Sequence, residues 1–150
     1  MEQQLKSNIA RTSPIIVERP SAIIPDTTQT PHFTITGRVI VTQIVGEVTV
    51  IVDSTATDIK LIANPTVGAD VDLCAAVTIT DDAVGTLYTI TGTLADAMIA
   101  TTSGAVGVQV GGILVTAGTI DLDSTATQTG YTKWTLHYIP LDKNSKVIIA

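Results

Sequence analysis

The stretch FTITGRVIVTQIVGEVTVIV, residues 33–52, alternates between apolar and polar side chains over much of its length. Phe33, Ile35, Val39 and Val41 occupy alternate positions, while threonines and an arginine fill most of the positions between them. A period of two places one set of side chains on each face of an extended chain, which is typical of a half-buried β-strand. Gly46 followed by a glutamate predicts a turn, so the stretch as a whole predicts a β-hairpin.

Short apolar runs of strand length recur along the rest of the chain, separated by turn signals such as DDAVG. They are DIKLIA (58–63), DVDLCAAVTIT (70–80), TLYTITG (86–92), AVGVQV (105–110), ILVTA (113–117), TIDLD (119–123) and YTKWTLHYI (131–139). The segment TLADAMIA (93–100) lacks the alternation and predicts a short helix. Many short strands broken by turns predict an all-β domain, a β-sandwich or barrel of the jelly-roll kind.

The composition indicates one domain with an aliphatic core. The chain has 150 residues, of which 45% are hydrophobic and only 3% aromatic, so valine, isoleucine, leucine and alanine must fill the interior. The net charge is −6, and the eight lysines and arginines are scattered rather than gathered in a basic stripe. An acidic domain repels phosphate backbones, so we do not expect nucleic acid as a partner.

Cys74 is the only cysteine, which rules out an intramolecular disulfide. Nothing in the chain therefore requires an oxidising compartment. The first residues, MEQQLKSNIARTS, lack the apolar run of a signal peptide, so we expect synthesis in a cytoplasm without export by that route.

The residues that could carry chemistry do not form a recognisable site. The acidic pairs Asp70/Asp72, Asp81/Asp82 and Asp121/Asp123 lack the glycine and distant glutamate of a calcium loop, and we interpret them as solvated side chains. The two histidines are His32, at the junction of two regions, and His137, which shares a strand face with Lys133 and should be exposed. We expect no catalytic residues, no cofactor and no metal, and hence no enzymatic activity.

A stretch of uncharged residues, 97–120, separates Asp96 from Asp121. It is long enough to raise the question of a membrane segment, but its glycines, serines and threonines dilute its apolar character. We therefore expect no membrane contact and place the stretch in the core or between subunits, where a glycine-rich segment lets two backbones approach closely.

Residues 1–32 differ in pattern and predict an extended, proline-rich N-terminal arm that precedes a single β domain at 33–150. Prolines 14, 20, 25 and 31 prevent helix formation and favour extended backbone. Between them lie paired apolar residues that a solvated linker would avoid. The alternatives are a disordered tail and an arm that becomes ordered on a neighbouring subunit, and we favour the second. Its predicted partner-binding residues are Ile15, Ile16, Val17, Ile23 and Ile24.

The phrases ITGRVIVTQIVGEVTVIV, NPTVGADVDLCAAVTITDDAVGTLYTITGTLADAM, GTIDL and KWTLHYIPLD span residues 35–142. In these phrases the chain resembles small structural proteins encoded among the virion genes of tailed bacteriophages. The resemblance implies a place in a phage particle, as a capsid cement or decoration protein or as a short head-fibre or tail component. It also implies a homo-oligomer, often a trimer.

These observations lead to one expected function and one alternative. The first is a decoration protein on the outside of a phage head that staples neighbouring major capsid subunits through its arm. The alternative is a head-fibre, spike or tail component that recognises the host surface, with Tyr131 as the best glycan-contacting candidate.

Overall fold

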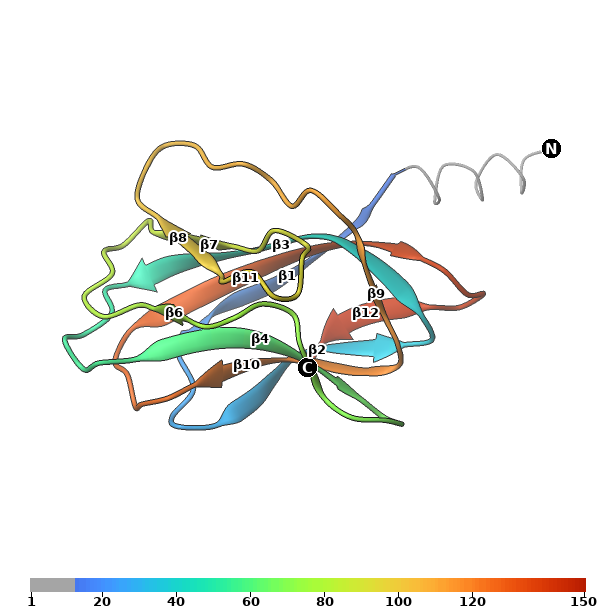
Figure 1. The fold of residues 1–150 in the computed structure, drawn as a ribbon, viewed down its shortest axis with the longest axis horizontal. Helices are drawn as coiled ribbons and strands as arrows, with labels where there is room; N and C mark the ends of the chain where they lie inside the picture. The colour runs from blue at the N-terminus through green and yellow to red at the C-terminus, as the bar shows by residue number, and fades with distance from the viewer. Residues whose placement is uncertain (1–12) are drawn as a thin grey trace.

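A computed structural model describes residues 13–150 of the chain. Over this range the protein is all-β, with strands that form two antiparallel sheets and with no helix. The two sheets pack face to face (Figure 1). The predicted all-β class is confirmed, and of the two architectures considered the protein adopts the β-sandwich.

Each sheet has six strands within the described residues. Sheet A has the order β1 (Ile15–Ile23), β11 (Tyr131–Pro140), β3 (Val39–Val50), β7 (Leu87–Thr89) and β8 (Ile99–Thr101), with β9 (Ile113–Val115) also paired to β3. Sheet B has the order β12 (Lys146–Ile149), β2 (Gln29–Thr36), β10 (Gly118–Ser124), β4 (Asp58–Pro65) and β5 (Val71–Asp72), with β6 (Val77–Thr78) also paired to β4.

The connectivity explains why the two sheets hold together. Strands β1, β2, β3 and β4 alternate between sheet A and sheet B, and so do the returning strands β10 and β11. As a result β11 lies between β1 and β3, while β10 lies between β2 and β4. This interleaved order is the jelly-roll arrangement, in which distant parts of the chain become neighbours in both sheets.

The core lies between the sheets and is built from the inward positions of the long strands. Val39, Val41, Ile59 and Leu61 are fully buried there, as the alternation in sequence requires. Trp134 of β11 and Tyr88 of β7 stack with ring centroids 6.3 Å apart and fill the centre.

The turn predicted at Gly46 is wrong, because β3 runs through this residue and pairs there with both β11 and β7. A Cβ atom on Gly46 would lie 2.7 Å from the Trp134 ring. Glycine is therefore required by the packing of the indole on the backbone and does not mark a turn. The chain turns earlier, at Gly37, whose φ of 70° is readily adopted by glycine.

The expected boundary between arm and domain also requires correction. Residues 15–23 form β1, which pairs along β11 and belongs to the sandwich. Pro20 is tolerated because β1 is an edge strand and its register with β11 is interrupted between Arg19 and Ala22. Pro31 lies in β2 beside a register shift with β10, beyond the residues that pair with β12. Residues 1–12 of the expected arm lie outside the described residues.

The middle of the chain is less regular than the sequence predicts. The helix predicted at 93–100 is absent from the described structure, where turns lead into β8. The strand predicted at 105–110 is an irregular loop, and the run 70–80 contains only the two-residue strands β5 and β6. Side chains such as Met98 and Leu73 nevertheless reach the core, and single backbone hydrogen bonds, such as those that join Ala75 to Asp96 and Met98, hold these segments in place of long ladders.

Candidate functional site

The residues predicted to bind a partner lie on or next to β1, the edge strand of sheet A. Ile15, Ile16 and Ile23 are exposed, with 40%, 58% and 51% of their surface accessible. Val17 packs partly against the core, and Ile24 is completely buried within it. The predicted set is therefore divided: three isoleucines are available to a partner, and Ile24 is a core residue.

The division follows from side-chain alternation along extended backbone, because the adjacent residues Ile23 and Ile24 point to opposite faces of sheet A. The amide of Ile24 donates a hydrogen bond of 2.9 Å to the carbonyl oxygen of Gly130, which continues the pairing of β1 with β11 by one residue. Ile23, one residue earlier, stands opposite Tyr131 in the ladder, and Tyr131 stands opposite Val50 of β3. All three of these side chains are exposed, so they form an apolar row across three strands at this end of sheet A.

A buried histidine of β2 packs against the inner side of sheet A. His32 is 3% exposed and its ring meets Trp134 edge to face, with the centroids 6.3 Å apart. Burial, followed by the nearby charge of Arg19, lowers the pKa of His32 to about 4, because both disfavour the imidazolium form. The Arg19 Nε is itself buried without a hydrogen-bond partner within the described structure, and burial lowers its pKa. His32 is thus neutral at physiological pH and serves packing.

The opposite edge of sheet A carries a second apolar surface, within the uncharged stretch 97–120 that the sequence places in the core or between subunits. The loop at 102–112 connects β8 to β9 along the upper side of Figure 1. Gln109, in the middle of this loop, is buried, while Val108 and Val110 on either side are 72% and 92% exposed. One sign of this arrangement is present in the sequence. The run AVGVQV contains a single polar residue, Gln109, among valines, and this polar residue occupies the buried position.

Gln109 fixes the loop to sheet A through several hydrogen bonds. Its side-chain nitrogen donates to the carbonyl oxygens of Val41 and Gly111, at 3.0 and 2.7 Å. Its backbone amide donates to the Gln43 side-chain oxygen at 3.1 Å, and the Val110 amide donates to Thr91 at 3.0 Å. The two exposed valines are therefore held outward by a rigid support.

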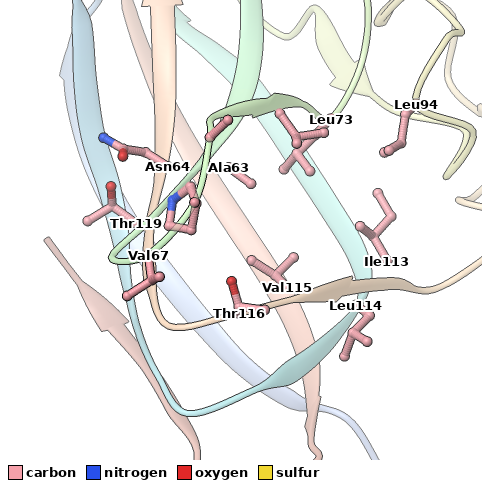
Figure 2. Close-up of a pocket in the computed structure, with 14 residues that line it drawn as sticks. Ala63, Asn64, Val67, Leu73, Leu94, Ile113, Leu114, Val115, Thr116 and Thr119 are labelled. Carbon is pink, nitrogen blue, oxygen red and sulfur yellow. The ribbon is translucent and has the colours of Figure 1, made fainter.

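Beside β9, a pocket of about 300 Å³ opens between the sheets (Figure 2). Its inner wall includes Ala63 of β4 and Leu73 just after β5 on one side, and Ile113 and Val115 of β9 on the other. Its rim carries exposed apolar side chains, namely Val67, Val71, Leu94 and Leu114. The described residues that line it are all uncharged. The pocket is where the hydrophobic core reaches the surface.

The polar candidates of the sequence lie on different elements of the sandwich. Within the described residues, no group of three or more histidine, cysteine or acidic side chains is placed to hold a metal ion. His137 lies on the outer face of β11, as predicted, opposite Ile16 and Gln43 in the ladder. Asp53 has its pKa lowered to about 2, chiefly by the hydrogen bond from the Thr55 amide, and it organises a turn.

The interpretation of Asp121 as a solvated side chain is wrong. It is 1% exposed, although the alternation of β10 turns it away from the core. The amide nitrogens of Gln29 and Asn64 cover it and donate hydrogen bonds of 2.8 and 3.2 Å to its Oδ2 atom. These amides come from the neighbouring strands β2 and β4, so the sequence of β10 alone could not reveal the burial.

Comparisons with protein-family models, with curated proteins and with solved structures gave no match to this chain. Over residues 13–150, no helix has the length and apolar character that a bilayer crossing requires. The site must therefore be interpreted from its own geometry, which offers two apolar surfaces at opposite edges of sheet A.

Proposed function

We propose that the protein is a decoration protein of a tailed-bacteriophage head, which binds the outer surface of the shell and holds neighbouring major capsid subunits together. Its partners would be the major capsid protein and further copies of itself, in a trimer. It would be made in the host cytoplasm, act on the capsid surface of the virion and have no catalytic turnover of its own.

The observation that carries this proposal is the set of exposed isoleucines on β1. Ile15 and Ile16 lie at its start and Ile23 at its end, and all three stay accessible on a strand that the sandwich holds in place. Exposed apolar side chains on a sheet edge offer contact area to a partner protein. Within the described residues β1 pairs with β11 alone, so a capsid segment could add as a further strand along its other edge. The sequence resemblance to phage virion proteins supplies the setting.

The position of β1 changes the expected mode of binding. An arm that becomes ordered on docking loses about 1 to 2 kcal/mol of chain entropy per residue. Residues 15–23 are already ordered in the sheet, so this part of the contact carries no such cost. Over these residues, we therefore expect a preformed strand to bind the capsid, in place of an arm that becomes ordered on docking.

The alternative is a head-fibre, spike or tail component that binds the host surface. Tyr131 is exposed and available for this role. Its ladder neighbours are Ile23 and Val50, however, and a glycan site also needs polar groups that orient the sugar hydroxyls. This environment fits a protein contact better, so the decoration role stands first.

The test is co-sedimentation of the protein with purified phage shells that lack it. The triple variant Ile15→Ser, Ile16→Ser and Ile23→Ser should fold normally and bind at least about tenfold more weakly, since each lost side chain removes part of its transfer free energy. Val84→Ser, at an exposed valine in a turn, is the matched control and should bind like the parent. Unchanged binding of the triple variant would contradict the proposal.

The salt dependence of the same binding gives a second readout. An apolar contact should weaken little between about 0.05 and 0.5 M salt, whereas a contact between charged surfaces would be screened. A steep loss of binding over this range would move the contact away from the isoleucine face.

A further inference from the structure

The apolar pocket and the fixed loop beside it remain without a role after β1 has been assigned to the shell. Both lie at the β8 and β9 side of sheet A, whereas β1 is the opposite edge strand. Gly92 packs so closely on Gly111 that a Cβ atom would lie 2.4 Å from the Gly111 carbonyl oxygen. The turn that carries Leu94 and the loop that carries Val110 are therefore neighbouring parts of one surface.

We propose that this surface is the contact between copies of the chain, in which Val108 and Val110 of one copy enter the pocket of the next. The inference deepens the proposed function, because it names the surface through which a decoration protein would associate with itself. It leaves β1 free for the shell.

The net charge of the molecule favours a contact through this surface. Each copy carries a net charge of −6, so two copies repel each other wherever charged faces meet. Residues 97–120 contain no charged side chain, and the described residues that line the pocket are uncharged as well. Contact between this loop and this pocket therefore buries no like charges and leaves no charge without a partner.

The size of the pocket and the rigidity of the loop also fit this contact. The side chains of Val108 and Val110 together contain six carbon atoms, the number in benzene, and a cavity of about 150 Å³ holds one benzene molecule. A pocket of about 300 Å³ has room for both. The hydrogen bonds of Gln109 already fix the loop, so docking costs little conformational entropy.

The exposed rim of the pocket favours a protein surface over a small apolar molecule as its occupant. A small molecule would fill the inner wall near Leu73 and Val115 but leave Val67, Val110 and Leu114 in water. A second copy covers the inner wall and the exposed rim together. The contact joins the loop of one copy to the pocket of the next, so each copy contributes two different sets of residues. Three copies around a three-fold axis close such a contact into a ring, in agreement with the proposed trimer.

Sedimentation of the full chain tests the contact. The parent should have a mass of at least three times the 15.6 kDa chain mass. Val110→Asp should raise the dissociation constant at least about 100-fold, because it places an unpaired charge in the apolar pocket. Val84→Asp, an equally drastic change at a 63% exposed valine elsewhere, should leave the mass unchanged. A monomeric parent, or a Val110→Asp variant that assembles like the parent, would overturn the proposal.

Cross-linking fixes the orientation of the contact. A chain with both Val67→Cys and Val110→Cys should form covalent rings on mild oxidation, while either single variant should stay uncross-linked, since Cys74 is buried. Covalent products of the double variant that stop at dimers would indicate reciprocal insertion about a two-fold axis and overturn the head-to-tail arrangement. Shell binding by monomeric Val110→Asp would show that the proposed function is independent of this contact, so each can fail alone.

Discussion

The two edges of sheet A expose apolar side chains in different ways. At the β1 edge, charged Glu18 and Arg19 stand between the isoleucines, and Pro20 interrupts the ladder. At the β8 and β9 edge, the strands are three residues long and the loop between them is uncharged. A long edge strand with free backbone groups invites unwanted pairing, and proline and charge limit it, whereas a short edge does not need such protection.

The two edges are therefore suited to different kinds of contact. β1 can add a strand or present its isoleucines, but only in a register that avoids Pro20 and satisfies its charges. The opposite edge has little ladder to extend and a pocket to fill, so it suits side-chain insertion. One sheet thus presents two apolar surfaces that need not compete for the same partner.

The largest expected effect comes from the two neighbouring isoleucines at the end of β1. Ile24→Ser should lower the free energy of unfolding by about 4 kcal/mol, because it removes a fully buried side chain and buries a hydroxyl. Ile23→Ser, one residue away and half exposed, should cost less than about 1 kcal/mol. Urea denaturation measures both values. Similar losses for the two variants would mean that β1 does not end as described.

The pH dependence of stability tests the packing behind β1. The pKa of His32 is about 4 in the folded protein and 6.5 when unfolded, so below pH 6.5 the unfolded chain binds a proton that the folded chain does not. Stability should therefore be greatest above pH 6.5 and fall by about 3 kcal/mol as the pH drops to 4.

Urea denaturation at successive pH values should show this loss in the parent and a reduced slope in His32→Gln. His137→Gln changes the other histidine, on the outer face of β11, and should keep the slope of the parent. If the two variants behaved alike, the decline would come from carboxylates and not from His32.

A smaller effect is expected at the opposite edge. Gln109→Ala should lower the free energy of unfolding by about 2 kcal/mol, because the Val41 carbonyl loses its side-chain donor. Hydrogen exchange should accelerate in the loop at 102–112 and in β9, and should stay slow where β1 pairs with β11. Uniform acceleration over both edges would show that the loop is not a separately supported surface.

Much of the fold could be predicted from alternation alone. The runs 58–63, 119–123 and 131–139 each appear as a strand, because long apolar alternation leaves one reasonable placement. The sequence did not predict β1 as a strand of the sandwich, because Pro20 lies within it and Pro14 and Pro25 lie beside it. An edge position and an interrupted register remove that objection.

The candidate surfaces depend more on contacts that are distant in sequence. Alternation predicts that only one of Ile23 and Ile24 is buried, but which one depends on the register of β1 with β11, more than one hundred residues later. The role of Gly46 depends on Trp134, and the burial of Asp121 on side chains from β2 and β4. The pocket exists only because β4 and β9 come from opposite sheets. Local patterns do not contain this information.

A cryo-electron map of an intact phage particle that contains this protein would show directly where the protein binds. We expect copies spread over the outside of the head, with Ile15, Ile16 and Ile23 of β1 against major capsid subunits. Copies confined to a vertex or the tail, or head-bound copies whose β1 isoleucines point into solvent, would contradict the decoration role.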